Sequence, residues 1–135
     1  MAASKVDHYS ASIDNRVGEA ARVLSAFRDA GVNFTALWAY PSSKKKAQLE
    51  MIPEPSAGFK NAAKKAGLAL SPKQTAFFVN GEDHAGVVAE SLSKLAEAGI
   101  NVGAVQAVCG GNGRYGAVIF LAQADVRKAA KVLGI

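Results

Sequence analysis

Polar and apolar residues alternate over residues 6–13, which predicts a β-strand whose more apolar face carries Tyr9, Ala11 and Ile13. A polar turn follows at residues 14–18. Beyond this turn, apolar residues recur at helical spacing and predict an amphipathic helix, with apolar positions at Ala20, Val23, Leu24, Phe27 and Ala30. Gly31 stands where a left-handed residue often ends a helix.

The next segments predict a hairpin and a second helix. Residues 32–40 are rich in β-branched and aromatic side chains, as strands are, and a turn at residues 41–46 leads to a second strand at 47–52. The short connection makes these two strands an antiparallel hairpin. A helix is expected over residues 56–66, and a short last strand over 68–70, before Pro72. This order is the ferredoxin-like βαββαβ arrangement.

The same pattern occurs a second time in the chain. Nine of the 22 residues from Gly18 to Ala39 are identical to the residue 68 positions further along. Strands are expected at residues 75–79, 100–109 and 117–122, and helices at 88–98 and 124–133. An internal repeat of this kind indicates that one folding unit is present in two copies.

The sequence therefore predicts an α+β protein of two ferredoxin-like units, residues 1–71 and 72–135, the second lacking its last strand. Without that strand, residues 75–79 would form an open sheet edge, which proteins normally cover. We expect another strand to cover this edge, contributed by the first unit or by a second subunit.

Two short motifs recur at matching positions of both units. The first is an acidic turn ending in glycine, at residues 14–18 (DNRVG) and 82–86 (EDHAG), and the second is the step AGVNF or AGINV, at residues 30–34 and 98–102. Through these motifs the sequence resembles a tandem pair of ACT domains, and the resemblance covers nearly the whole chain. It departs from that family at Val17 and Ala85, where a proline often precedes the turn glycine.

The resemblance implies a regulatory protein without a catalytic domain, which binds a free amino acid between adjacent units. In such a site the turn before the first helix of one unit faces the asparagine step of its neighbour. We also expect a homodimer, formed through sheet-edge or helix contacts. The implied ligand-binding residues are Asp14, Asn15, Val17, Gly18, Glu19, Asn33, Asp83, His84, Ala85, Gly86, Val87 and Asn101.

The residue types at these positions suit an amino-acid ligand. A glycine at a helix start lets a carboxylate approach backbone N–H groups that lack intrahelical partners and carry partial positive charge. An asparagine side chain offers an acceptor and donors, so it suits both ends of a zwitterion. A purely structural role for these residues is the alternative, because glycine and asparagine also shape turns in proteins that bind no ligand there.

Composition and charge narrow the class of protein. Of the 135 residues, half are hydrophobic and a fifth are charged, which is typical of a soluble globular protein. The single cysteine, Cys109, cannot form an internal disulfide. The sequence shows no signal peptide and no apolar run of the ~18 residues that a membrane helix needs. We therefore expect a cytoplasmic protein with no membrane partner. The net charge of +5 arises mainly in the first half, from the lysines at 44–46, 60, 64 and 65, which we interpret as a turn and a solvated helix face.

Other functions have weaker support. An RNA-recognition domain shares the βαββαβ order, and residues 114–120 and 77–80 loosely resemble its aromatic motifs, but the detailed match fails, so we expect no nucleic-acid partner. A structural or interaction module without a ligand remains the other alternative.

Residues 111–116 match G-x-G-x-x-G, the fingerprint of dinucleotide-binding sites. In such sites a helix follows the motif, whereas here a strand follows it. We therefore expect an Asn-Gly hairpin turn.

We expect no catalytic residues, metal or cofactor. The only histidines, His8 and His84, occupy non-equivalent positions, and no cluster of ligating residues has metal-site spacing. Cys109 has no basic residue nearby in sequence and is interpreted as a small core or turn residue. Trp38 and Tyr40 are interpreted as core or interface residues.

Overall fold

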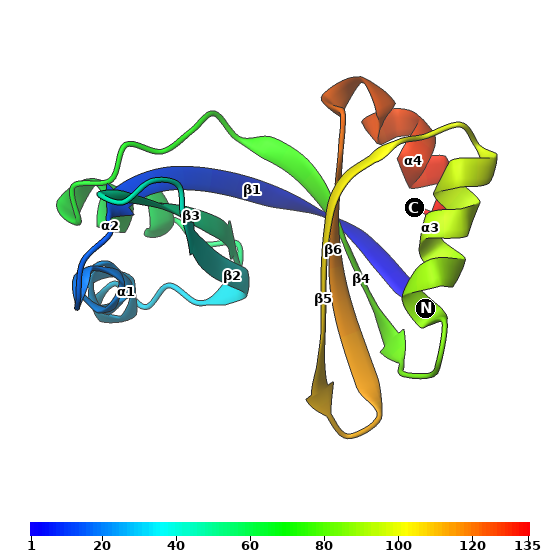
Figure 1. Cartoon of the computed structure of the whole chain (residues 1–135), viewed down its shortest axis with the longest axis horizontal. Helices are drawn as coiled ribbons and strands as arrows, with labels where there is room; N and C mark the ends of the chain where they lie inside the picture. Colours follow the sequence, from blue (N-terminus) through cyan, green and yellow to red (C-terminus); the bar gives the residue numbers. More distant parts are fainter. The chain divides into compact units, whose positions relative to one another are not determined.

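The computed structural model describes all residues 1–135 (Figure 1). The strands are β1 (Ala2–Asp14), β2 (Phe34–Pro41), β3 (Lys46–Pro53), β4 (Gln74–Glu82), β5 (Val102–Gly111) and β6 (Arg114–Leu121). The helices are α1 (Glu19–Asp29), α2 (Phe59–Lys65), α3 (Val87–Glu97) and α4 (Val126–Val132), with a 3-10 turn η1 (Gln123–Asp125) before α4. None of the helices combines the length and the apolar character needed to span a membrane.

The contacts divide the chain into two compact units that share one long strand. One unit is Asp7–Lys73, and the other combines Met1–Val6 with Gln74–Ile135. The strand order is β2-β3-β1-β4-β6-β5, so β1 is the hydrogen-bonded neighbour of β4. The N-terminal part of β1 therefore covers the edge at residues 75–79, as predicted. The repeat boundary between residues 71 and 72 stays a prediction.

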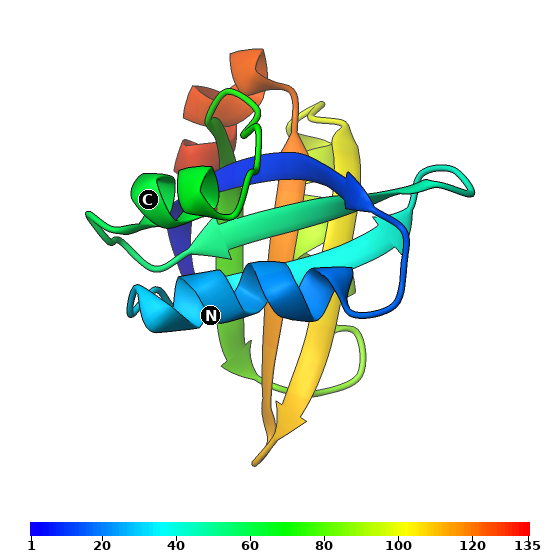
Figure 2. The ribbon, with the colours of Figure 1, turned by 90° about the vertical axis from the view of Figure 1, so that its left-hand side faces the viewer.

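In the unit Asp7–Lys73, α1 and α2 lie on one face of β1, β2 and β3 (Figure 2). The apolar face of β1 is the predicted one, because Tyr9, Ala11 and Ile13 are all buried in this core. Phe27 of α1 stacks on Phe59 of α2, with ring centroids 5.3 Å apart. This contact joins the two helices, and Tyr9 of β1, whose ring centroid lies 5.0 Å from that of Phe59, joins α2 to the sheet.

The other unit, Met1–Val6 with Gln74–Ile135, has a core of its own. Its helices α3 and α4 pack on β4, β5 and β6, and Phe77, Leu95 and Ile119 are fully buried between them. Ala3 of β1 packs against the same core. The Asn112–Gly113 hairpin between β5 and β6 forms as predicted, and both residues have positive φ, 58° and 68°, as a type I′ turn requires.

The predicted short strand at residues 68–70 is wrong, because these residues form no strand in the structure. The segment is held to β1 at one point. Ser71 N–H donates to the carbonyl of Ser10 at 2.8 Å, and Ser10 N–H donates to the side-chain hydroxyl of Ser71 at 2.9 Å. A side chain thus replaces the backbone acceptor that a ladder requires, and Pro72 has no N–H to continue it.

Candidate functional site

The turn between β1 and α1 leaves the start of the helix open. Gly18 is the N-cap residue, with a left-handed φ of 83°, and no side chain caps the helix. The first N–H groups of a helix have no intrahelical acceptor. Beside them, the side chain of Val17 is fully exposed. This turn can therefore present backbone donors to a small anionic group.

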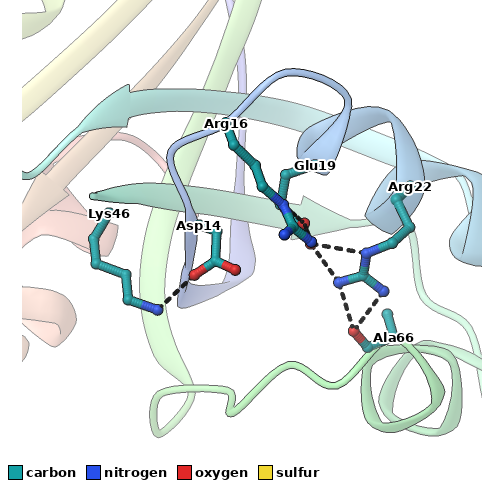
Figure 3. Close-up of polar contacts among 6 residues, drawn as sticks. All are labelled: Asp14, Arg16, Glu19, Arg22, Lys46 and Ala66. Atoms are coloured by element: carbon teal, nitrogen blue, oxygen red, sulfur yellow. Dashed lines mark hydrogen bonds and ion pairs between the residues drawn. The ribbon is translucent and has the colours of Figure 1, made fainter. Parts of the chain in front are cut away.

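The loop between β2 and β3 is fastened to this turn. Asn15 N–H donates to the carbonyl of Lys45 at 2.8 Å, and the Asn15 side-chain amide lies 3.4 Å from the carbonyl oxygen of Lys44. The ammonium of Lys46 donates to Asp14 Oδ1 at 2.8 Å (Figure 3). This hydrogen bond and the charge of Lys46 hold the pKa of Asp14 below its usual value.

Glu19, the first residue of α1, is buried and bound by two arginines (Figure 3). Arg16 donates to Glu19 Oε2 at 2.8 Å, and Arg22 donates to Glu19 Oε1 through Nε at 2.8 Å and also through Nη2. Arg22 also donates to the carbonyl of Ala66 at the C-terminal end of α2, at 3.2 Å. The hydrogen bonds from Arg22 and Arg16 lower the pKa of Glu19. Both carboxylate oxygens of Glu19 are thus occupied by protein donors.

The corresponding turn of the second unit has the same backbone and different side chains. Gly86 caps α3 with φ 86°, again without a side-chain cap. The backbone N–H of Asp83 donates to the carbonyl of Gly113 at 2.7 Å, which fastens this turn to its own hairpin. His84 Nε2 lies 3.8 Å from Glu90 Oε1, and both side chains are exposed. Val87 stands where the first unit has Glu19, so the carboxylate held by two arginines has no counterpart here. Ala85 is exposed and Val87 is half-buried.

The two asparagines lie at the other end of the helices. Asn33 follows α1, and its Oδ1 accepts a hydrogen bond from the backbone N–H of Phe34 at 2.9 Å. Its amide lies 3.4 Å from Glu54 Oε1. Asn101 follows α3 and is exposed. Because each helix has 11 residues, about 16 Å of helix separates the turn from the asparagine of the same unit. One unit alone therefore does not bring the predicted residues together.

A polar cluster on β1, β2 and β3 was missed by the sequence analysis. Glu50 is buried, and its Oε2 lies 2.6 Å from both His8 Nε2 and Ser10 Oγ. The hydroxyl of Tyr40 donates to Glu50 Oε1 at 3.3 Å, and the ring of Trp38 stacks on His8 at 6.1 Å. The side chains gather because Ser10 and Trp38 are both register partners of Glu50.

This polar cluster is not a catalytic triad. His8 and Ser10 both approach the same oxygen of Glu50, whereas a triad needs the carboxylate and the hydroxyl on different ring nitrogens. The pKa of Tyr40 is raised, first by desolvation and then by the charge of Glu50. Alternation along β1 and β3 is the signal that would have placed His8, Ser10 and Glu50 on one face. No group of three His, Cys, Asp or Glu side chains that could hold a metal ion occurs in the structure.

The interpretation of one further residue changes. Cys109 is exposed on β5, so the interpretation as a core or turn residue is wrong. A hydrogen bond with Asp83 raises the pKa of the Cys109 thiol, so a reactive thiolate is disfavoured there. Of the aromatic residues considered for RNA stacking, Phe77 and Tyr115 are buried in the core of their unit.

The sequence matches no protein-family model and no curated protein. Its structure is similar to that of protein BT0572 from Bacteroides thetaiotaomicron, with a TM-score of 0.82 and 19% identity over 97% of this chain and 88% of that one. It is also similar to the regulatory subunit of aspartate kinase from Thermus thermophilus in its ligand-free form, with a TM-score of 0.65 and 14% identity over 98% and 95% of the two chains.

A third similar structure is a putative C-terminal regulatory domain of aspartate kinase from Porphyromonas gingivalis, with a TM-score of 0.58 and 13% identity, covering 98% of this chain and 93% of that one. At these identities the likeness concerns the fold. The chain, with its six-stranded sheet and four helices, therefore has an α+β fold similar to that of these aspartate kinase regulatory structures.

Proposed function

We propose that this protein is a non-enzymatic regulatory module of two ACT-like units, residues 1–71 and 72–135, that binds a free amino acid. The ligand binds at the turns before α1 and α3, in contact with Asn33 or Asn101 of a neighbouring unit. The observation that carries the proposal is the pair of glycine-capped helix starts at Gly18 and Gly86, which have no side-chain cap. The similarity in fold to regulatory subunits of aspartate kinase supports it.

The space around the two glycines is suitable for a ligand. A Cβ atom placed on Gly18 or Gly86 would meet no heavy atom within 4 Å. The carboxylate of an amino acid can therefore approach the amide groups of the first helical turn and the partial positive charge of the helix. The first of these amides in each unit, Glu19 N–H and Val87 N–H, also donates to a carbonyl of its own turn, at 3.3 and 3.2 Å. The exposed side chains of Val17 and Ala85 lie beside the same amides. The ammonium group needs acceptors from elsewhere, which the asparagine amides supply.

The proposal includes assembly. Each turn and its own asparagine lie at opposite ends of an 11-residue helix, so a complete site requires two units. The strands β2 and β5 are the two edge strands of the sheet and can pair with a second copy. We therefore propose a homodimer formed through sheet-edge or helix contacts, and we place it in the cytoplasm. Ligand binding would shift this assembly by its differential affinity for the two states.

A thermal-shift screen against the twenty amino acids tests the proposal. A ligand present at a hundredfold excess over its Kd should stabilise the protein by about 2.7 kcal/mol. N33A and N101A should reduce that stabilisation, whereas the hairpin variant N112G should leave it unchanged. If no amino acid raises the melting temperature at millimolar concentration, amino-acid sensing is rejected.

One observation favours the alternative of an interaction module without a ligand. In the first unit, Glu19 is held by two arginines and Asn33 already bonds the backbone of Phe34. These two side chains then serve the fold alone. This alternative would be supported if the screen finds no amino acid that binds and if N101A has the same melting temperature as the wild type.

A further inference from the structure

A groove in the unit Asp7–Lys73 lies where the predicted last strand does not form. It has a volume of about 330 Å³ and runs between α2 and residues 68–73. Because this segment is hydrogen-bonded to β1 only through Ser71, it does not pack as a strand against the helix. The volume falls within the range of about 300 to 1,000 Å³ typical of small-molecule sites.

The rim of the groove carries positive charge that the protein neutralises only in part, at Lys73. Lys60, Lys64 and Lys73 line it, and no carboxylate does. Lys73 approaches Asp7 only at 4.0 Å, and neither Lys60 nor Lys64 forms an ion pair. Lys60 and Lys64 are four residues apart on α2, at a spacing where like charges repel. A bound anion would relieve this repulsion.

The floor of the groove is apolar. Tyr9 is buried, and Leu68 and Leu70 are half-buried along its wall. A ligand that fits this surface has an apolar body of a few carbons and an acidic group near the lysines. An added ammonium group would face three lysines and no carboxylate, so its charge would be repelled.

We propose that this groove binds a small amphipathic carboxylate that lacks an amino group. The site is separate from both helix-start turns and does not depend on the amino-acid function proposed above. It selects against amino acids by the same lysines that attract the carboxylate. The ligand class is thus a short aromatic or branched carboxylic acid.

Three probes with one apolar body test this inference: 3-phenylpropionate, 3-phenylpropan-1-ol and L-phenylalanine. Titration of the full chain, followed by 15N–1H NMR, should show saturable shifts at residues 60–73 with the carboxylate only. Raising the salt from about 0.05 M to about 0.5 M should weaken this binding, because the lysines are exposed. Shifts at residues 14–19 or 82–87 would report the helix-start turns instead, so the two proposals fail separately.

The double variant K60Q/K64Q should weaken 3-phenylpropionate binding about fivefold, as expected for two exposed charge contacts. The matched control is K65Q, which removes a lysine from the same helix outside this groove and should leave the affinity unchanged. An unchanged melting temperature would show that both variants fold. The inference is overturned if residues 60–73 show no saturation below about 10 mM carboxylate, if the alcohol binds equally well, or if K65Q has the effect of K60Q/K64Q.

Discussion

Glycine caps both α1 and α2, but the two caps have different backbone conformations. Gly18 has a left-handed φ of 83°, whereas Gly58 has an ordinary right-handed φ of −86°. A side chain at the left-handed position is strained even though the space around Gly18 is open. The open turn therefore depends on backbone conformation and not on close packing.

We expect G18A to lower the free energy of unfolding by about 1 to 2 kcal/mol, because alanine disfavours the left-handed region. The matched control is G58A, whose added Cβ would lie at ordinary contact distances, 3.5 Å from the carbonyl oxygen of Ala30. That variant should be neutral or more stable by up to about 1 kcal/mol. Urea unfolding measures both, and equal losses would contradict the assignment of strain to Gly18.

The thiol of Cys109 gives a second prediction for a single residue. The hydrogen bond with Asp83 is the largest cause of its raised pKa. D83N removes the negative charge, so the thiol pKa should fall and the rate of alkylation by iodoacetamide at constant pH below that pKa should rise. E82Q removes a neighbouring charge outside this contact and should change the rate less. An unchanged rate in D83N would show that the contact does not control the thiol.

Arg22 connects two elements, since it binds Glu19 at the start of α1 and the last turn of α2 at Ala66 (Figure 3). The carboxylate keeps its charge more easily in the folded chain, because its pKa is lowered there. A group of this kind stabilises the fold above its unfolded pKa, near 4.5 for Glu19, and this stabilisation is lost as the pH falls through the lower folded pKa.

We therefore expect R22Q to make the loss of unfolding free energy below pH 4.5 less steep than in the wild type. R28Q is the control, because Arg28 lies in the last turn of α1 and pairs with Asp29 on the surface. Chemical denaturation between acidic and neutral pH measures the slope. A slope in R22Q identical to that of R28Q would exclude a role for Arg22 in the acid response.

At the scale of the whole molecule, β1 belongs to both units. Its residues Met1–Val6 belong with Gln74–Ile135, where β1 neighbours β4, and Ser91 Oγ donates to Met1 Sδ at 3.3 Å. Deletion of residues 1–5 should therefore expose the edge of β4. Amide hydrogen exchange should show lost protection in β4 and retained protection in β2 and β3. Full protection of β4 after the deletion would mean that its pairing with β1 contributes little.

Much of the fold could be predicted from the sequence because its signals are local. A few neighbouring residues determine the helical spacing of apolar residues in α1 and α3, the Asn112–Gly113 turn and the apolar face of β1. The helix-start glycines were recognised for the same reason. The polar cluster at Glu50 was missed, because it forms only when β1, β2 and β3 pair in one register.

The sequence by itself determined the recurrence of the two motifs, the positions of the observed helices and strands to within a few residues, and the left-handed glycines that open α1 and α3. Only the tertiary structure decided that β1 would extend to cover β4, that residues 68–70 would not form a strand, and that three lysines would line the resulting groove. The physical reason is the distance along the chain over which each kind of interaction acts. Periodicity and φ preference act within a few residues, whereas strand pairing and the convergence of charges depend on competition among partners distant in the chain.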